Sequence, residues 1–198
     1  KKNVFDNSIY NMLTDNKNNL KLISVGSLKW QKGYDRLIKA FKIVKNEIPD
    51  AILLIIGEGV VRKDIEKLVK GYNLNDCVFL PGVIENPYPF ISASDIFISS
   101  SRYEGFSNAI LESLLLKIPV VATDCPSGIR GIIKQDRNGW LSNINNNNVK
   151  NLADNIIKAS KNIKDIDMNK ESDIIIENYG VKNISIEYEK FFKDLKEM

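Results

Sequence analysis

The sequence of 198 residues contains no histidine. A Ser-His-Asp triad, a Cys-His pair and a histidine-ligated metal site are therefore excluded within the chain. Its two cysteines, Cys77 and Cys125, form no CxxC motif. We expect two free buried thiols rather than a disulfide, which indicates a reducing compartment and a cytoplasmic location.

The sequence also lacks long apolar runs and a strong charge bias. No run approaches the ~18 consecutive apolar residues that a membrane-spanning helix needs. Lysine and arginine number 28 against 25 acidic residues, a net charge of +3, and no basic stripe accompanies the aromatic residues. This composition argues against a nucleic-acid partner. No signal peptide follows Lys1, and because the chain does not begin with methionine we expect it to be either a piece of a longer protein or a processed product.

What the sequence does contain is a regular alternation of two hydrophobic patterns. Short apolar runs predict strands at 20–26, 51–57, 77–80, 95–99 and 118–122, with a weaker one at 139–141. Apolar residues spaced three and four apart predict helices at about 37–45, 61–71, 107–116, 149–160 and 182–197. Runs such as Ile52–Ile56 and Val120–Ala122 are apolar on both faces, as in strands buried between two helical layers. The pattern predicts an α/β fold with a doubly wound, mostly parallel, Rossmann-like sheet and helices on both faces.

The ends of the chain differ from its middle. Residues 1–19 are polar and rich in asparagine, and we interpret them as a linker or a loosely docked helix outside the core. Residues 20–180 carry the alternating pattern and form the predicted domain, and residues 181–198 form a terminal amphipathic helix.

In a sheet of this type, ligands bind outside the carboxyl ends of the strands. Four loops lie there, at 26–33, 57–59, 99–107 and 123–131. The first places Lys32 just before a helix, which suits a phosphate, although a lone lysine near a turn is more often a solvated surface residue. Gly57 and Gly59 form a GxG, but Arg62 stands where a dinucleotide fingerprint has its third glycine.

The loop at 99–107 is the richest in polar groups. Glu104 lies beside Gly105, and Glu112 interrupts the apolar residues of the following helix. An ionised carboxylate accepts strong hydrogen bonds from sugar hydroxyls, and the amides at a helix start bind phosphate. Glu112 alone is equally consistent with a polar helix face, and helical phase does not show that the two carboxylates converge.

Together these loops resemble the C-terminal, nucleotide-sugar-binding domain of the family-4, or group 1, retaining glycosyltransferases, which have the GT-B fold. The resemblance is carried by VGSLKWQKGYDRLIKAF, LLIIGEG, VFLPGVI, ASDIFISSSRYEGFSNAILESLLLKIPVVATDCPSG and NGWL, from about Val25 to Leu141. Glu104 and Glu112, with seven residues between them, match the family's E-x7-E signature, which is specific only within its surrounding motif. The predicted sheet would then be one half of a GT-B fold.

The resemblance implies a role for each matched residue. Glu112 would hold the ribose hydroxyls of the donor, and Glu104 would contact hydroxyls of the transferred sugar. Lys32 would neutralise the departing diphosphate, so Lys32 and Glu104 are the candidate catalytic residues. The other donor-binding candidates are Gly26, Ser27, Gly82, Val83, Ile84, Gly105, Phe106 and Ser107, and the loop from Gly82 to Ile84 would border the base.

Two positions depart from the family pattern. Ser27 stands where members usually have an arginine that serves as a second diphosphate cation, and Gly131 stands where relatives often have an acid. Lys29 or Arg130 is a possible substitute cation. Without a substitute we expect weaker donor binding, since losing one charge-assisted contact typically costs about 1.5–3 kcal/mol.

The resemblance implies a metal-independent retaining enzyme that transfers sugar from a UDP-hexose or UDP-N-acetylhexosamine to an acceptor hydroxyl in bacterial polysaccharide or glycan biosynthesis. No cofactor is expected beyond the nucleotide-sugar substrate. A glycan or lipid-linked acceptor would bind a missing N-terminal domain, toward which residues 181–198 would pack. That domain would also make any peripheral contact with the inner face of the plasma membrane.

Without the missing domain we expect the chain to bind donor but to transfer nothing. Two alternatives remain open at this point. One is a non-catalytic glycosyltransferase-like binding module, with Ser27 and Gly131 as signs of lost donor chemistry. The other is a nucleotide-sugar epimerase or phosphorylase that shares the GT-B plan.

Overall fold

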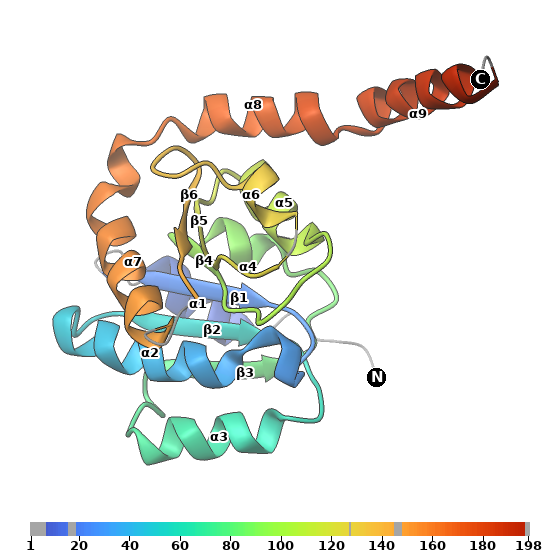
Figure 1. The fold of residues 1–198 in the computed structure, drawn as a ribbon. Coiled ribbons are helices and arrows are strands. Elements are labelled where there is room, and N and C mark those ends of the chain that lie inside the picture. The colour runs from blue at the N-terminus through green and yellow to red at the C-terminus, as the bar shows by residue number, and fades with distance from the viewer. Residues whose placement is uncertain (1–6, 16–18, 127, 145–147, 197–198) are drawn as a thin grey trace.

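The computed structural model describes residues 7–15, 19–126, 128–144 and 148–196. Its centre is one sheet in the order β3-β2-β1-β4-β5-β6, in which every pairing is parallel (Figure 1). The strands are β1 (Lys21–Val25), β2 (Ile52–Ile56), β3 (Val78–Gly82), β4 (Ile96–Ser99), β5 (Val120–Thr123) and β6 (Gly139–Ser142). The predicted fold class and all six predicted strands are confirmed, with no end shifted by more than two residues.

Two groups of helices cover the sheet. In the first, α2 (Tyr34–Glu47) contacts both α3 (Arg62–Gly71) and α7 (Asn148–Asn162). In the second, contacts run from α1 (Asn7–Asp15) through α4 (Tyr88–Ser92) and α5 (Asn108–Leu115) to α8 (Met168–Tyr179). From β1 the chain first adds strands on one side, β2 and then β3, and later adds β4, β5 and β6 on the other side. Because the crossovers are right-handed, this reversal of direction places the two groups of helices on opposite faces of the sheet. The remaining elements are η1 (Trp30–Lys32), α6 (Ile129–Ile132), η2 (Ile163–Asp165) and α9 (Val181–Lys196).

The core follows from the two hydrophobic periods. All five residues of β2 are buried, as are Val120 to Ala122 of β5, which confirms that these strands lie between two helical layers. On α2 the residues Leu37, Phe41 and Val44, spaced four and three apart, are fully buried. Neither Cys77 nor Cys125 forms a disulfide and both are buried, as expected.

The N-terminal segment includes a helix, as one of our two interpretations had it, but this helix contributes to the core, which we did not expect. Residues 7–15 form helix α1, and the Leu13 side chain is fully buried. The ring of Tyr10 packs edge-on against Phe90 of α4, with centroids 5.8 Å apart. The sequence did not indicate a buried helix here, because the many asparagines outweigh the one apolar face of this short segment. Residues 1–6 and 16–18 of the predicted extension lie outside the described residues.

Helix α8 was not predicted, because its apolar residues do not repeat over several turns. It follows a capping signal: the side chain of Asp167 accepts a hydrogen bond from the amide of Lys170. The helix packs on α5, where the Ser172 hydroxyl donates to the Leu115 carbonyl at 3.2 Å. It therefore covers α5, the helix that follows the Glu104 loop.

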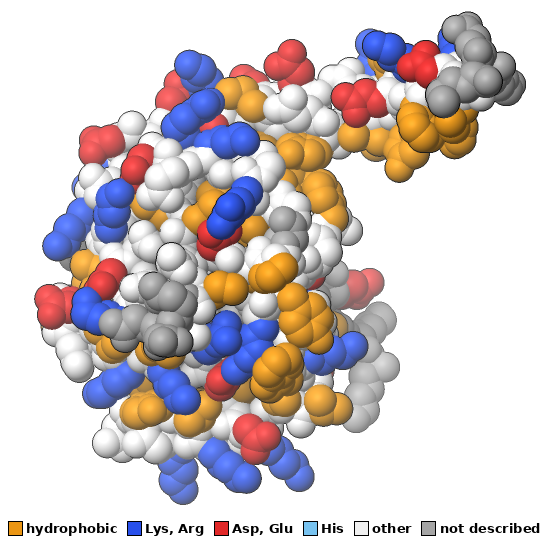
Figure 2. Space-filling model, viewed as in Figure 1, with side chains coloured by type: hydrophobic (Ala, Val, Ile, Leu, Met, Phe, Trp, Pro, Cys, Tyr) orange, Lys and Arg blue, Asp and Glu red, His pale blue; other side chains and the backbone are white. Residues whose placement is uncertain are grey.

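Helix α9 continues beyond α8 and projects from the body of the molecule (Figure 1). Apolar side chains gather along one side of this arm (Figure 2). The apolar residues of α9 that are at least half exposed are Val181, Ile186, Tyr188, Phe191, Phe192 and Leu195. The predicted amphipathic helix is present, although residues 197–198 lie outside the described part. Within that part, no helix combines the length and apolar character needed to cross a bilayer.

Candidate functional site

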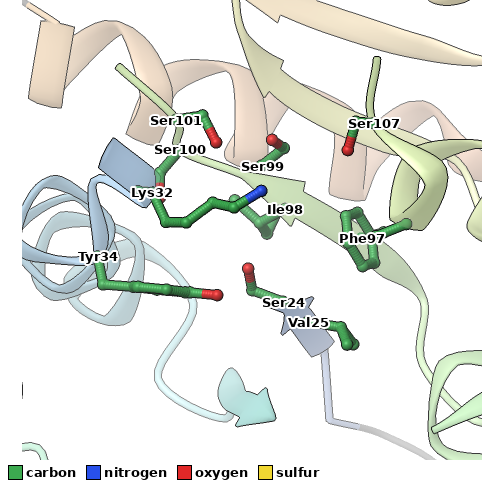
Figure 3. A pocket seen from close by; sticks show the side chains of 11 residues that line it. Ser24, Val25, Lys32, Tyr34, Phe97, Ile98, Ser99, Ser100, Ser101 and Ser107 are labelled. Carbon is green, nitrogen blue, oxygen red and sulfur yellow. The ribbon is translucent and has the colours of Figure 1, made fainter. Parts of the chain in front are cut away.

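The strand order reverses between β1 and β4, and a pocket opens there at the carboxyl ends of both strands. It is lined by the ends of β1 and β4, the turn that carries Lys32, the ring of Tyr34, and Ser107 with Ala109 at the start of α5. In Figure 3 the Lys32 side chain extends into this pocket, among the hydroxyls of Ser24, Tyr34 and Ser99. Two of the four loops singled out in the sequence therefore meet at one place.

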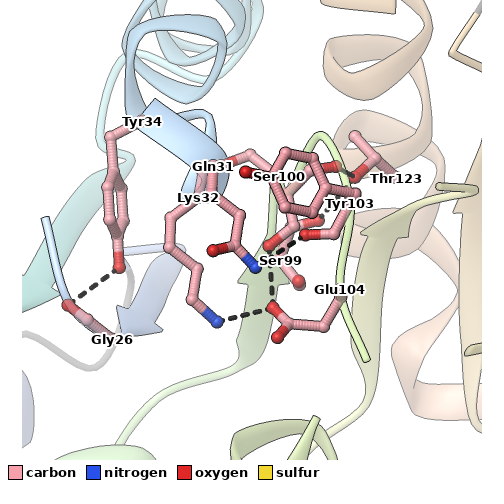
Figure 4. Close-up of polar contacts among 10 residues, drawn as sticks. Gly26, Gln31, Lys32, Tyr34, Ser99, Ser100, Tyr103, Glu104 and Thr123 are labelled. Carbon is pink, nitrogen blue, oxygen red and sulfur yellow. Dashed lines mark hydrogen bonds and ion pairs between the residues drawn. The ribbon is translucent and has the colours of Figure 1, made fainter. Parts of the chain in front are cut away.

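Lys32, which lines this pocket, forms an ion pair with Glu104 (Figure 4). Lys32 Nζ lies 2.5 Å from Glu104 Oε2, and the two side chains are 24% and 12% exposed. The Ser101 hydroxyl donates to the same carboxylate oxygen at 3.1 Å. The structure thus brings together the two candidate catalytic residues, which are 72 positions apart.

Tyr34 forms the floor of the site and was not predicted as a functional residue. Its hydroxyl donates to the Gly26 carbonyl at 3.2 Å. Burial raises the pKa of Tyr34 to about 12; a hydrogen bond with Ser24 opposes this shift and the charge of Glu104 adds to it. The phenol therefore stays protonated and acts as a donor at neutral pH. The only available signal was its place directly after the Lys32-Gly33 turn.

Gly26 directly follows β1, and the Lys32 side chain passes close to its backbone. A β-carbon at this position would lie 3.2 Å from the Tyr34 hydroxyl and 3.6 Å from Lys32 Cε. The glycine thus leaves room for the lysine stem close to the backbone. The neighbouring Ser27 is exposed, and its carbonyl accepts a hydrogen bond from the amide of Lys29 at 2.9 Å.

Hydroxyl groups hold the loop after β4 in place. Ser100 Oγ donates to the Lys32 carbonyl at 2.8 Å, and Thr123 Oγ1 donates to the Ser101 carbonyl at 2.5 Å. Ser100 and Ser101 are buried. The sequence showed these serines within the motif without revealing their partners, which lie in η1 and at the end of β5.

The start of α5 lies next to the ion pair. Glu104 precedes this helix, as expected, and Ser107 is its N-cap residue. Gly105, Phe106 and Ser107 connect the two, so their amides precede the positive end of the helix dipole. The Phe106 side chain is 53% exposed, and its ring lies 5.7 Å from that of Tyr179 at the end of α8.

Glu112 lies within α5 and is half-buried. It follows Ala109, which lines the pocket, by three residues, so it shares that side of the helix about one turn further on. This placement is compatible with a contact to one end of a ligand whose other end reaches Glu104. That contact stays a prediction.

The loop from Gly82 to Ile84 lies at the end of β3, beside the turn after β2. The Gly57 amide donates to the Gly82 carbonyl at 2.8 Å. Gly82 has φ +90, and a β-carbon there would lie 3.1 Å from Glu58 Oε1. Val83 is 60% exposed and Ile84 is half-buried. An exposed apolar edge next to backbone polar groups is a surface on which a base can rest.

Arg62 ties these two turns together. It pairs with Glu58, donates to Glu66 Oε1 at 2.7 Å, and donates to the Leu80 carbonyl at 2.7 Å. The arginine that excluded a dinucleotide fingerprint thus has a bridging role that the sequence did not reveal.

The two possible substitute cations lie in different places from Lys32. Lys29 is exposed and lines a separate pocket between η1, α2 and α3. Arg130 is on α6, where its guanidinium donates to both carboxylate oxygens of Asp124 at 2.7 and 2.6 Å. That bond holds the pKa of the Asp124 carboxyl below its usual range. Arg130 can reach a phosphate only by leaving or sharing this pair.

Two further observations bear on what the site can hold. Among the described residues, no group of three or more histidine, cysteine or acidic side chains is placed to hold a metal ion. The groups gathered at the pocket are one ammonium, one carboxylate, several hydroxyls and the amides before α5. Such a set can hold an anionic group together with a neighbouring polyhydroxylated group.

Known proteins share this sequence and fold. The chain is 37% identical over 127 residues to the N-acetylgalactosamine-N,N'-diacetylbacillosaminyl-diphospho-undecaprenol 4-alpha-N-acetylgalactosaminyltransferase of Campylobacter jejuni, covering 64% of this chain and 34% of that protein. It is 32% identical over 155 residues to the poly(ribitol-phosphate) alpha-N-acetylglucosaminyltransferase of Staphylococcus aureus, covering 77% and 31%. The chain therefore spans about a third of the length of these relatives.

A solved structure agrees with these relatives. TarM of Staphylococcus aureus, crystallised with fondaparinux, alpha-GlcNAc-glycerol and UDP, matches with a TM-score of 0.79 and 29% identity. The match covers 87% of this chain and 35% of that one. The family model described as glycosyl transferases group 1 matches residues 9–178, which is most of the chain. This protein therefore belongs to the group 1 glycosyltransferases, and its sheet has the architecture of one half of a GT-B fold.

Proposed function

We propose that this chain is the donor-binding half of a retaining glycosyltransferase that uses a UDP-linked hexose or N-acetylhexosamine. The observation that carries the proposal is the Lys32–Glu104 pair at the carboxyl ends of β1 and β4. It places a cation for a diphosphate next to a carboxylate for sugar hydroxyls, in a family whose relatives transfer sugars. The UDP in the TarM crystals supports a uridine nucleotide.

The proposed reaction breaks the bond between the sugar C1 and the diphosphate oxygen and forms a bond from C1 to the acceptor oxygen on the same face of the sugar. The acceptor hydroxyl proton passes to the departing phosphate. Negative charge grows on the diphosphate in the transition state, where Lys32 and the amides before α5 stabilise it. Glu104 orients the sugar, and Glu112 holds the ribose. On this account no divalent metal takes part.

The acceptor is proposed to bind an N-terminal domain of a longer protein, since the chain spans about a third of its relatives. The relatives' names indicate a glycan or lipid-linked acceptor in bacterial glycan synthesis. The exposed apolar side of α9 would pack on that domain. Limited trypsinolysis tests this: cleavage at Lys190 and Lys193 should be fast in this chain and slow in the longer protein.

Calorimetric titration with UDP, GDP and a panel of UDP-sugars tests donor binding. We expect saturable UDP binding that Glu112→Ala weakens by about tenfold, the loss of one good hydrogen-bonding group. Asp154→Ala is the matched control, because this acid lies on α7 and pairs only with exposed Lys150 at 2.6 Å among the contacts of the described residues. Equal effects of the two substitutions would contradict a ribose contact.

Product analysis distinguishes a transferase from the alternative functions. A binding module would bind ligand without consuming donor in the longer protein. An epimerase would change the donor sugar without any acceptor, and a phosphorylase would need inorganic phosphate. Net transfer with retained anomeric configuration, seen only in the longer protein, would support the proposal. Transfer by the 198-residue chain alone would contradict its assignment as half of the enzyme.

A further inference from the structure

The distance between Lys32 and Glu104 depends on the positions of two backbone segments, neither of which belongs to a strand. Lys32 ends the turn η1 after β1, whereas Glu104 lies in the irregular loop five residues beyond the end of β4. Both side chains are long and flexible, so their meeting point is set by how these segments are held. The Ser100 bond to the Lys32 carbonyl fixes the start of this loop, and Glu104 lies four residues further along it.

Arg102 makes further contacts between the two segments, closer to Glu104. The side chain of Arg102 is only 12% exposed, and its two terminal nitrogens donate to both carboxylate oxygens of Asp35 at 2.8 and 2.7 Å. Arg102 Nη1 also donates to the Trp30 carbonyl at 2.6 Å, and the guanidinium carbon lies 4.4 Å from the centroid of the Trp30 ring. The Arg102 amide donates to the Gln31 carbonyl at 2.7 Å. We call this set, Arg102, Asp35 and the Trp30–Gln31 backbone, the Arg102 latch.

The latch is placed next to both members of the ion pair. Arg102 is two residues before Glu104, and Gln31 directly precedes Lys32. Gln31 Nε2 adds a hydrogen bond to the Tyr103 carbonyl at 3.1 Å. The contact is close enough to require glycine at position 33, where φ is +66 and a β-carbon would lie 2.1 Å from the Ser100 carbonyl oxygen.

The chemistry of the latch suits a rigid link. Burial works against ionisation of Asp35, but the hydrogen bonds and charge of Arg102 outweigh it and hold the pKa of that carboxyl below its usual range. The pair therefore stays charged throughout the neutral range. An arginine fork fixes both distance and orientation, whereas the single ammonium nitrogen of a lysine lacks this fixed planar geometry.

We infer that Arg102 and Asp35 are positioning residues, which touch no ligand themselves and hold Lys32 and Glu104 at the spacing that the donor diphosphate and sugar require. The inference rests on the proposed function of the pair. It predicts that loosening the latch weakens donor binding through Lys32, while the sheet and the rest of the pocket stay intact.

A double-mutant cycle tests this. Arg102→Lys keeps the charge but loses the fork, and we expect it to weaken binding of UDP and UDP-N-acetylglucosamine by about tenfold in calorimetry. In a Lys32→Ala background the same substitution should change affinity by less than about twofold. Asp35→Asn should behave like Arg102→Lys. Melting temperatures measured alongside separate any loss of folding from loss of binding.

Arg137→Lys is the matched control. Arg137 also donates two bonds to one carboxylate, at 3.1 and 2.9 Å to Oε1 of Glu171, but it joins the β6 side of the sheet to α8. We expect UDP affinity within about twofold of the parent, since distant ion pairs act independently. An equal loss from Arg102→Lys with and without Lys32, or the same loss from Arg137→Lys, would overturn the inference.

Hydrogen exchange tests the latch without any ligand. Arg102→Lys should speed exchange of amides at 100–107 and leave those of β1, β2 and β4 unchanged. Unchanged exchange at 100–107 would overturn the inference even if UDP binds. Failure of the parent chain to bind any nucleotide would count against the proposed function, and faster exchange in the variant would then confirm the mechanical link alone and overturn its role in donor binding.

Discussion

Replacing Glu104 by glutamine should tighten the binding of free UDP, although Glu104 belongs to the proposed site. Without a ligand, Lys32 is already paired with Glu104 at 2.5 Å. A diphosphate that recruits Lys32 must therefore compete with an internal carboxylate. Glutamine keeps the shape and a weak acceptor but removes the charge, so this competition largely ends.

The magnitude follows from the burial of the pair. A hydrogen bond between charged groups contributes about 1.5–3 kcal/mol net, which corresponds to roughly ten- to a hundredfold in affinity. The pair is partly exposed, at 24% and 12%, and a hydrogen bond from Lys32 to the neutral amide oxygen of the introduced glutamine would persist. Both facts favour the lower end, so we expect UDP and inorganic pyrophosphate each to bind about tenfold more tightly to Glu104→Gln.

The substitution should raise the affinity for a UDP-sugar less than the affinity for UDP. Glutamine offers the sugar hydroxyls one acceptor oxygen, whereas the carboxylate offers two. The assay is calorimetry with pyrophosphate, UDP and UDP-N-acetylglucosamine, with Asp154→Asn as the control, because Asp154 is an exposed acid on α7 that does not line the pocket. Unchanged or weaker binding of pyrophosphate and UDP by the folded variant would refute the competition between Glu104 and phosphate for Lys32.

Three further predictions concern folding. Leu13→Ala should lower the free energy of unfolding in urea by about 2–5 kcal/mol, because Leu13 is fully buried; a loss under ~0.5 kcal/mol would restore the linker interpretation. Gly33→Ala should destabilise the protein strongly, since its β-carbon would lie 2.1 Å from the Ser100 oxygen, whereas Gly71→Ala, with open space in α3, should be neutral or stabilising by up to about 1 kcal/mol in the same assay. The pKa of Asp35 is lower in the folded protein than its ordinary value of 3.8. The ionised side chain therefore stabilises the fold fully at pH values above 3.8, and this contribution is lost as the pH falls through the pKa of the folded state. Asp35→Asn should flatten that acid limb in thermal unfolding from pH 5 to 2, and an unaltered limb would contradict the ion pair.

Much of the fold was accessible from local pattern. Burial on both faces makes a strand such as Ile52–Ile56 uniformly apolar, and a parallel sheet needs helical crossovers, so the alternation led directly to the doubly wound class. The failures were local too. Leu13 sits in an asparagine-rich segment where one turn of apolar residues is outweighed by composition, and α8 shows its Asp167 cap more clearly than its periodicity.

The amino-acid order alone determined the class of the sheet, the loops at its carboxyl edge, and Lys32 and Glu104 as candidates. Only the tertiary structure decided that these two form an ion pair, that Arg102 grips Asp35, and that Lys29 faces a different pocket. The physical reason is the range of the interactions involved. Helix and strand periods repeat within a few residues, whereas a 2.5 Å contact between residues 72 positions apart depends on strand order, register and the path of two irregular loops together.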